Sequence, residues 1–163
     1  MLVVRGETAL SAFRTEKKLA AVREICPAVL SLRTEFVYLA DTSGGLSQAG
    51  IRMLEDLVHA RRDRGDLPRG PHVLLVVPRP GTISPWSSKA TDIVRHCGLT
   101  GIERLERAIL WELAFEPGYQ PDDALLARLK PLIHDRMTQA VLPDIGSADS
   151  LFRHGEPAPV QYV

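Results

Sequence analysis

The segment from Pro80 to Asp92 holds the densest group of residues in this chain that could do chemistry: Pro-Gly-Thr-Ile-Ser-Pro-Trp-Ser-Ser-Lys-Ala-Thr-Asp. Its Ser-Pro pair at positions 84 and 85 is typical of a helix N-cap followed by proline at the first helical position. The free N–H groups and the dipole of a helix start favour an anion. Ser87, Ser88 and Lys89 therefore indicate a phosphate or carboxylate site.

A plainer interpretation of the same residues is a well-capped helix whose Lys89 points into water. Gly81 allows a positive φ angle before the cap, and Thr82 and Ser84 have oxygens able to accept from the first helical N–H groups. The spacing matches neither the Walker lysine motif nor G-x-G-x-x-G. Residue types alone favour this plainer interpretation.

The remaining reactive side chains do not form a recognisable active site. The five histidines show neither H-E-x-x-H nor a paired metal spacing, and no G-x-S-x-G motif is present. His96 adjoins Cys97, but neighbours on a helix point in different directions, so we expect Cys97 to be a buried structural thiol. We predict no catalytic, cofactor-binding or metal-binding residue. Strand carboxylates beside arginines predict cross-strand ion pairs on an exposed face; these are Glu35, Glu103, Glu106 and Glu112.

Composition narrows the class of protein further. The 163 residues carry 20 basic and 20 acidic side chains, which argues against a nucleic-acid arm or a polybasic membrane anchor. No apolar run reaches the length of a membrane span, and the strand-like start at Leu2 predicts no signal peptide. Two cysteines make no disulfide framework and are typical of reduced thiols in the cytoplasm.

Hydrophobic periodicity predicts an α/β (α+β) chain in which strands and helices alternate. Pro131 within the last helix predicts a kink, residues 61–71 read as a surface connection, and the proline-rich residues from 143 onward predict an extended linker. The expected strands are 2–5, 29–40, 73–77 and 102–115, and the expected helices are 11–26, one beginning at Ser47, one running from Ser84 to Gly98, and 122–141.

The two halves of the chain look like copies of one strand-helix-strand-helix unit. Lys17 and Val22 recur 72 residues later as Lys89 and Val94, and Leu54 and Leu57 recur as Leu126 and Leu129. One such half would leave a sheet edge and an apolar face open, whereas two halves about a pseudo-twofold axis close both. We therefore expect one domain over 1–142, made of halves 1–65 and 72–142, and a linker over 143–163.

The chain resembles the N-terminal region of the long, single-chain phosphoribosylformylglycinamidine synthase family along nearly its whole length. The central run from Leu74 to Ile93 is the most specific part of the resemblance. The other matching segments are Arg5-Gly6, Ala9–Arg14, Glu35–Tyr38, Cys97–Leu99, Arg104–Arg107, His134–Met137, Leu151-Phe152 and Pro157–Val160.

The resemblance implies a domain similar to a dimer of the small PurS subunit, in a cytoplasmic ligase of purine biosynthesis that uses ATP, magnesium and glutamine. It implies that the synthetase and glutaminase domains of the same chain are the partners, that neither nucleic acid nor membrane is one, and that this region alone is inactive and holds no cofactor. Cys26 and Cys97 do not match the glutaminase nucleophile motif. The residues expected to contact the other domains are Arg79, Thr82, Ser84, Trp86, Ser87, Ser88, Lys89, Thr91 and Asp92.

Two alternatives remain beside an assembly domain of the large enzyme. One is a stand-alone, non-catalytic scaffold subunit of a split synthase, which would assemble with separate synthetase and glutaminase chains. The other is an independent anion-binding or nucleotide-binding module that uses the helix start at Ser84.

Overall fold

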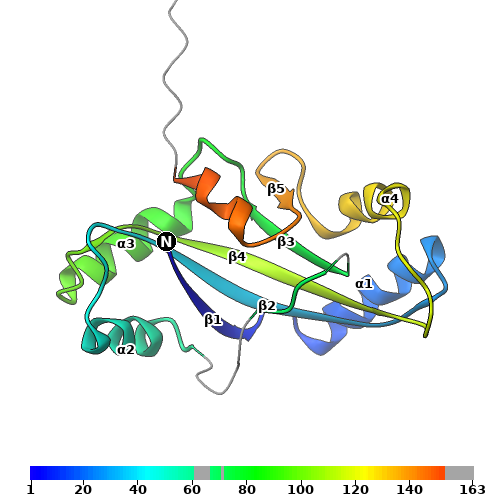
Figure 1. Cartoon of the computed structure of the whole chain (residues 1–163), viewed down its shortest axis with the longest axis horizontal. Coiled ribbons are helices and arrows are strands. Elements are labelled where there is room, and N and C mark those ends of the chain that lie inside the picture. The colour runs from blue at the N-terminus through cyan, green and yellow to red at the C-terminus, as the bar shows by residue number, and fades with distance from the viewer. Residues whose placement is uncertain (61–66, 71, 153–163) are drawn as a thin grey trace, which may run out of the picture.

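Ten elements alternate along the chain in the computed structural model, which describes residues 1–60, 67–70 and 72–152 (Figure 1). The strands are β1 (Leu2–Thr8), β2 (Val29–Thr42), β3 (Val73–Pro78), β4 (Ile102–Phe115) and β5 (Gln139–Leu142), and the helices are α1 (Ala12–Ile25), α2 (Gln48–Leu57), α3 (Pro85–His96), α4 (Asp123–Ile133) and the 3-10 helix η1 (Gly146–Leu151).

The strands form one antiparallel sheet in the order β1-β2-β4-β3-β5. The long central strands β2 and β4 each have 14 residues and lie side by side (Figure 1). Phe36 pairs with Ile109, which is its own equivalent 73 residues later. The pseudo-twofold axis therefore passes between these two residues, and the predicted α+β fold of two similar halves is confirmed.

A pair of arginines repeats the same local bonding in each half. Arg23 at the end of α1 donates from Nε and Nη2 to the carbonyls of Val29 and Leu30, at 2.8 and 2.6 Å. Arg95 at the end of α3 donates from the same atoms to the first two carbonyls of β4, at 3.0 and 2.8 Å. Each arginine joins the helix end to the start of the following long strand, so the same hydrogen bonds hold the helix-to-strand connection in both halves.

Four helices cover one face of the sheet. α1 and α4 pack over one end on Leu32, Trp111 and Leu113, while α2 and α3 pack over the other end on Tyr38 and Leu105 (Figure 1). These strand residues share one face because alternate side chains point the same way. Among the described residues, no helix has the length and apolar character needed to cross a membrane.

The opposite face is covered by the C-terminal part of the described chain. Ala148 and Leu151 of η1 are almost fully buried against Val37, Leu39 and Leu110. The expectation of an extended linker from residue 143 was therefore wrong for 146–151. Two apolar side chains at helical spacing pack there on a sheet face that the four helices leave uncovered. Residues 153–163 lie outside the described part.

Several expected boundaries were also wrong. The last long helix ends at Ile133 instead of residue 141, because Pro131 falls two residues before its end, and residues 139–142 form β5 instead. Cys97, which was expected to be buried, is exposed because it caps α3 beyond its buried face. Gly98 follows the helix with φ +92°, as predicted. Of the expected surface connection at 61–71, residues 61–66 and 71 lie outside the described residues.

Candidate functional site

The Pro80–Asp92 segment forms a turn between β3 and α3. Ser84 caps the helix, accepting the backbone N–H of Ser87 on Oγ at 3.0 Å, as predicted. Gly81 has φ +81°, a backbone conformation that an L-residue rarely adopts. Thr82 does not accept from the helix; its hydroxyl donates to the carbonyl of Arg79 at 2.6 Å and closes the turn.

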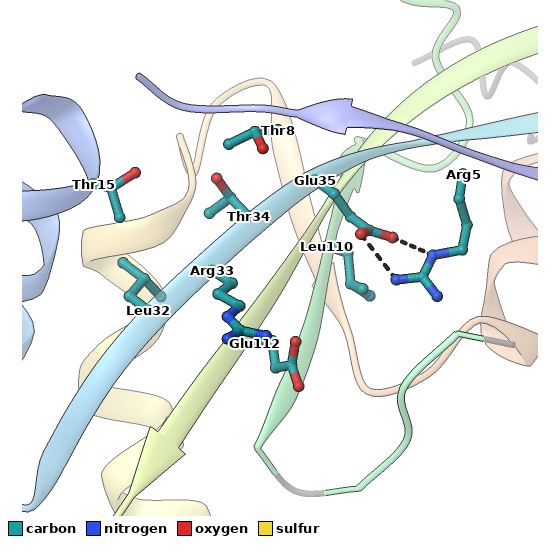
Figure 2. Close-up of a pocket in the computed structure, with 9 residues that line it drawn as sticks. All are labelled: Arg5, Thr8, Thr15, Leu32, Arg33, Thr34, Glu35, Leu110 and Glu112. Atoms are coloured by element: carbon teal, nitrogen blue, oxygen red, sulfur yellow. Dashed lines mark hydrogen bonds and ion pairs between the residues drawn. The ribbon is translucent and has the colours of Figure 1, made fainter. Parts of the chain in front are cut away.

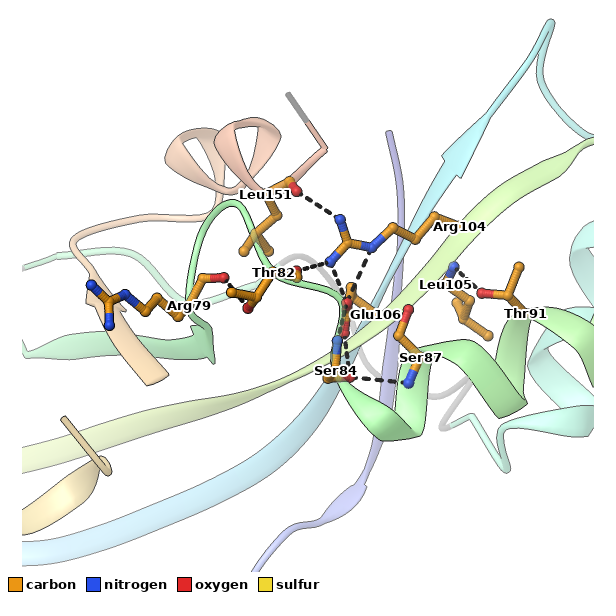
Figure 3. Close-up of polar contacts among 9 residues, drawn as sticks. All are labelled: Arg79, Thr82, Ser84, Ser87, Thr91, Arg104, Leu105, Glu106 and Leu151. Atoms are coloured by element: carbon orange, nitrogen blue, oxygen red, sulfur yellow. Dashed lines mark hydrogen bonds and ion pairs between the residues drawn. The ribbon is translucent and has the colours of Figure 1, made fainter. Parts of the chain in front are cut away.

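Glu106 holds this turn in place from β4 (Figure 3). Its carboxylate is fully buried and accepts the hydroxyl of Ser84 at 2.8 Å and the guanidinium of Arg104 through Nε at 3.1 Å. Arg104 also donates to the carbonyl of Thr82 at 2.5 Å and to that of Leu151 at 3.0 Å. This Arg104–Glu106 clasp joins the turn, the start of α3 and η1 to one strand.

The nine predicted contact residues divide into three groups by burial. Ser87 is fully buried and Thr91 is 8% exposed, and the hydroxyl of Thr91 accepts the backbone N–H of Leu105 at 3.0 Å. Ser84 and Trp86 are half-buried. The exposed members are Arg79, Thr82, Ser88, Lys89 and Asp92. The structure thus presents five of the nine to solvent, and it uses Ser84, Ser87 and Thr91 to position the helix.

An anion at the helix start would find few free donors, because two of the first N–H groups are engaged and one position has none. The N–H of Ser87 bonds the Ser84 hydroxyl, that of Ser88 bonds the Ser84 carbonyl at 3.2 Å, and Pro85 has none. The Oγ of Ser87 has no partner within the described chain, but it is enclosed in the domain and not turned to the surface. The geometry therefore favours the capped-helix interpretation over the phosphate site.

A groove of about 630 Å³ lies beside this turn, on the face of the sheet that carries the helices. Arg107 of β4 lies in it between two rings, with its guanidinium carbon 4.5 Å from the Phe36 centroid and 4.8 Å from that of Trp86. Ile83 and Met137 line the groove as well and are 59% and 77% exposed. The groove is mostly apolar and has one stacked cation at its base, which we call the Arg107 groove.

Tyr38 packs behind this cation. Its ring centroid lies 5.7 Å from that of Trp86. Burial raises the pKa of Tyr38, and the charge of Arg107, together with its hydrogen bond to the phenol, opposes part of that rise. Gly6 of β1 makes the arrangement possible, because a Cβ there would lie 2.6 Å from the Tyr38 ring.

A second, polar pocket of about 420 Å³ lies where β1 leaves β2 (Figure 2). Arg5 and Glu35 form a two-pronged ion pair in it, with Nε–Oε1 at 2.6 Å and Nη2–Oε2 at 2.9 Å. Arg33 and Glu112 lie opposite each other on β2 and β4 (Figure 2). A carboxylate held by a guanidinium in this way is poorly suited to proton transfer. The ion pair in this pocket therefore favours a role in stabilising the fold over a role in catalysis.

Two carboxylates expected on an exposed strand face are buried instead. Glu35 is 4% exposed and Glu106 is fully enclosed, because Arg5 and Arg104 respectively supply charged partners. Glu103 is exposed as expected, but its ion pair at 3.4 Å is with Arg95 of α3 and not with a residue of another strand. Within the described ranges, no three His, Cys, Asp or Glu side chains converge on a point that could hold a metal ion.

Sequence reasoning missed Arg107 and the Arg104–Glu106 clasp as parts of this site. A signal for Arg107 was present: it is the one charged residue in a run of alternate apolar residues on β4, from Leu105 to Phe115. A cation on that face must lie among apolar side chains. For Glu106 the sequence carries no comparable signal, because its partner Ser84 lies 22 residues away.

The fold and the site together define an internally duplicated α+β domain in which the turn lies in the second half and the groove is lined by residues of both halves. The family model of the formylglycinamide ribonucleotide amidotransferase N-terminal domain matches residues 35–152. The chain therefore belongs to this PurS-like family, whose parent enzyme is a ligase of purine biosynthesis.

Proposed function

We propose that this domain holds the synthetase and glutaminase parts of the amidotransferase together and so supports the transfer of ammonia between them. The domain itself contributes contacts and no chemistry, and the enzyme works in the cytoplasm with ATP and magnesium bound elsewhere in its chain. The contact surface is the turn and the exposed side of α3, with Arg79, Thr82, Ser88, Lys89 and Asp92 outermost.

The observation that carries the proposal is the exposure of two large aliphatic side chains within this same segment. Ile83 and Ile93 are 59% and 56% exposed and lie ten positions apart, before and along α3. Apolar side chains grouped with charged ones on a surface are typical of a protein–protein contact.

The rigid mounting of the segment supports the same role. The Arg104–Glu106 clasp and the buried Ser87 and Thr91 fix both the turn and the helix before any partner arrives. A preformed surface loses little conformational entropy on docking, which favours a permanent interface between parts of one enzyme.

The test is the double variant Ser88→Ala/Lys89→Ala in the full-length amidotransferase. Both residues are exposed on α3, so we expect stability to change little. Glutamine-dependent synthesis should fall by about tenfold, while ammonia-dependent synthesis stays near the wild-type level, because each lost interface contact costs on the order of 1 kcal/mol.

The matched control is Glu16→Ala/Lys17→Ala, two adjacent exposed positions in the N-terminal half of α1. This variant should leave both activities unchanged. Wild-type rates with both nitrogen sources in the Ser88→Ala/Lys89→Ala enzyme would disprove the docking role of this surface.

A further inference from the structure

The Arg107 groove contains a cation without an ionic partner. Arg107 is half-buried on β4, and among the described residues it forms no ion pair. Its neighbours are the rings of Phe36 and Trp86 and the phenol of Tyr38, which is neutral near pH 7 as an ordinary tyrosine is. The stacking rings orient the guanidinium but do not neutralise it.

A guanidinium fixed against two rings is well prepared to bind a carboxylate. Its planar fork matches a carboxylate in two-pronged geometry, and the rings already restrict its rotation. Because apolar surfaces surround the groove, an ion pair formed there is screened less by water than one on an open surface. The charge thus selects an acidic group.

The rim of the groove selects an apolar group next to the acid. Ile83 stands on the turn side, and Met137 stands between α4 and β5. Both are largely exposed, and methionine adapts well to a partner's shape. The groove volume of about 630 Å³ admits several side chains, which suits a peptide segment.

We infer that the Arg107 groove receives a segment of the remaining amidotransferase chain that places an Asp or Glu carboxylate on Arg107 and an adjacent apolar side chain between Ile83 and Met137. The inference rests on the proposed docking function and names the chemistry of the partner. Continuity supports it, since the turn that carries Arg79 and Thr82 also lines the groove. Because Arg107 gives the groove a positive charge, the segment that complements it is acidic.

The experiment uses Arg107→Lys in the full-length amidotransferase, treated with a water-soluble carbodiimide. This reagent joins an amine to a carboxylate in direct contact and adds no spacer atoms. Arg128→Lys, at an exposed position on α4, is the matched control. Mass spectrometry of the digest should show position 107 joined to an Asp or Glu beyond residue 163, with no such product from position 128.

Charge reversal tests the same pair in solution. Arg107→Glu should reduce glutamine-dependent synthesis at least tenfold and leave ammonia-dependent synthesis unchanged, whereas Arg107→Lys, which keeps the charge but loses the planar fork, should reduce it less. Circular dichroism of both variants reports whether the domain is folded. If Arg107→Glu unfolds it, the crosslink from Arg107→Lys alone tests the inference.

The outcomes separate this inference from the docking proposal. A crosslink from position 107 only to residues 1–163, or to a second copy of the domain, overturns the inference. Normal activity of Arg107→Glu beside impaired Ser88→Ala/Lys89→Ala overturns it too and leaves the docking surface standing. Normal activity of both variants overturns both proposals.

Discussion

The two halves of the domain place different side chains at equivalent backbone positions. At a separation of 73 residues, Thr34 of β2 corresponds to Arg107 of β4, and Arg33 corresponds to Glu106. Thr34 is buried and accepts the backbone N–H of Leu10 at 3.2 Å, so its side chain forms its hydrogen bond within the first half. Arg107 instead leaves a charge open to a partner.

The helix starts show the same divergence. Ser11 and Ser84 both cap their helices, and Phe13 and Trp86 follow at equivalent positions. Phe13 is 74% exposed, whereas Trp86 is half-buried against Tyr38. The repeated backbone therefore keeps its helix caps and its strand register in both halves. The side chains that differ, Arg107 and Trp86, are those of the second half that line the groove.

The largest expected effect comes from Glu106→Ala, which breaks the clasp present in the second half alone. Arg104 would keep its charge at 12% side-chain exposure without a carboxylate, so the free energy of unfolding should fall by about 3–5 kcal/mol. Urea denaturation measures this loss. Glu103→Ala, which removes only an exposed ion pair, should stay within about 0.5 kcal/mol of wild type. A loss below about 1 kcal/mol for Glu106→Ala would show that the clasp is dispensable.

A smaller effect is expected from truncating the two equivalent aromatic residues. Trp86→Ala should lower the free energy of unfolding by about 2 kcal/mol, since a half-buried ring contributes less than the fully buried rings for which larger losses are known. Phe13→Ala should change it by less than about 0.5 kcal/mol because the ring is largely in water. Equal losses in matched urea titrations would contradict the asymmetry between the halves.

The smallest effect concerns alkaline pH. The folded-state pKa of Tyr38 lies above its ordinary value of 10.0, chiefly because of burial. Its contribution to stability is therefore fully present below about pH 10 and is lost as the pH rises through the folded-state pKa. Its equivalent, Trp111, does not titrate. Tyr38→Phe should make the urea midpoint fall less steeply between about pH 9 and pH 11 than in wild type. Parallel curves would contradict this assignment.

Local signals in the sequence predicted most of the backbone. Ser-Pro at 84–85 and the alternation along β4 act over few residues, and the repetition at a spacing of 72 or 73 residues can be read from the sequence directly. Each was confirmed. The errors came from tertiary contacts. Nothing near Ala148 or Leu151 indicates that η1 will find an open sheet face, and nothing near Glu106 indicates that a turn folded from residues 79–84 will donate to it.

The pseudo-twofold axis between Phe36 and Ile109 has a genetic consequence. In a symmetric pair of identical half-length chains, one codon would specify both positions, and any substitution beside the axis would appear twice. A guanidinium would then stand at both positions where Arg107 and Thr34 now differ, one on each side of the axis. Joining the halves into one polypeptide gives each position its own codon. A single mutation can therefore place one charge near the centre of the sheet without a symmetry-related copy.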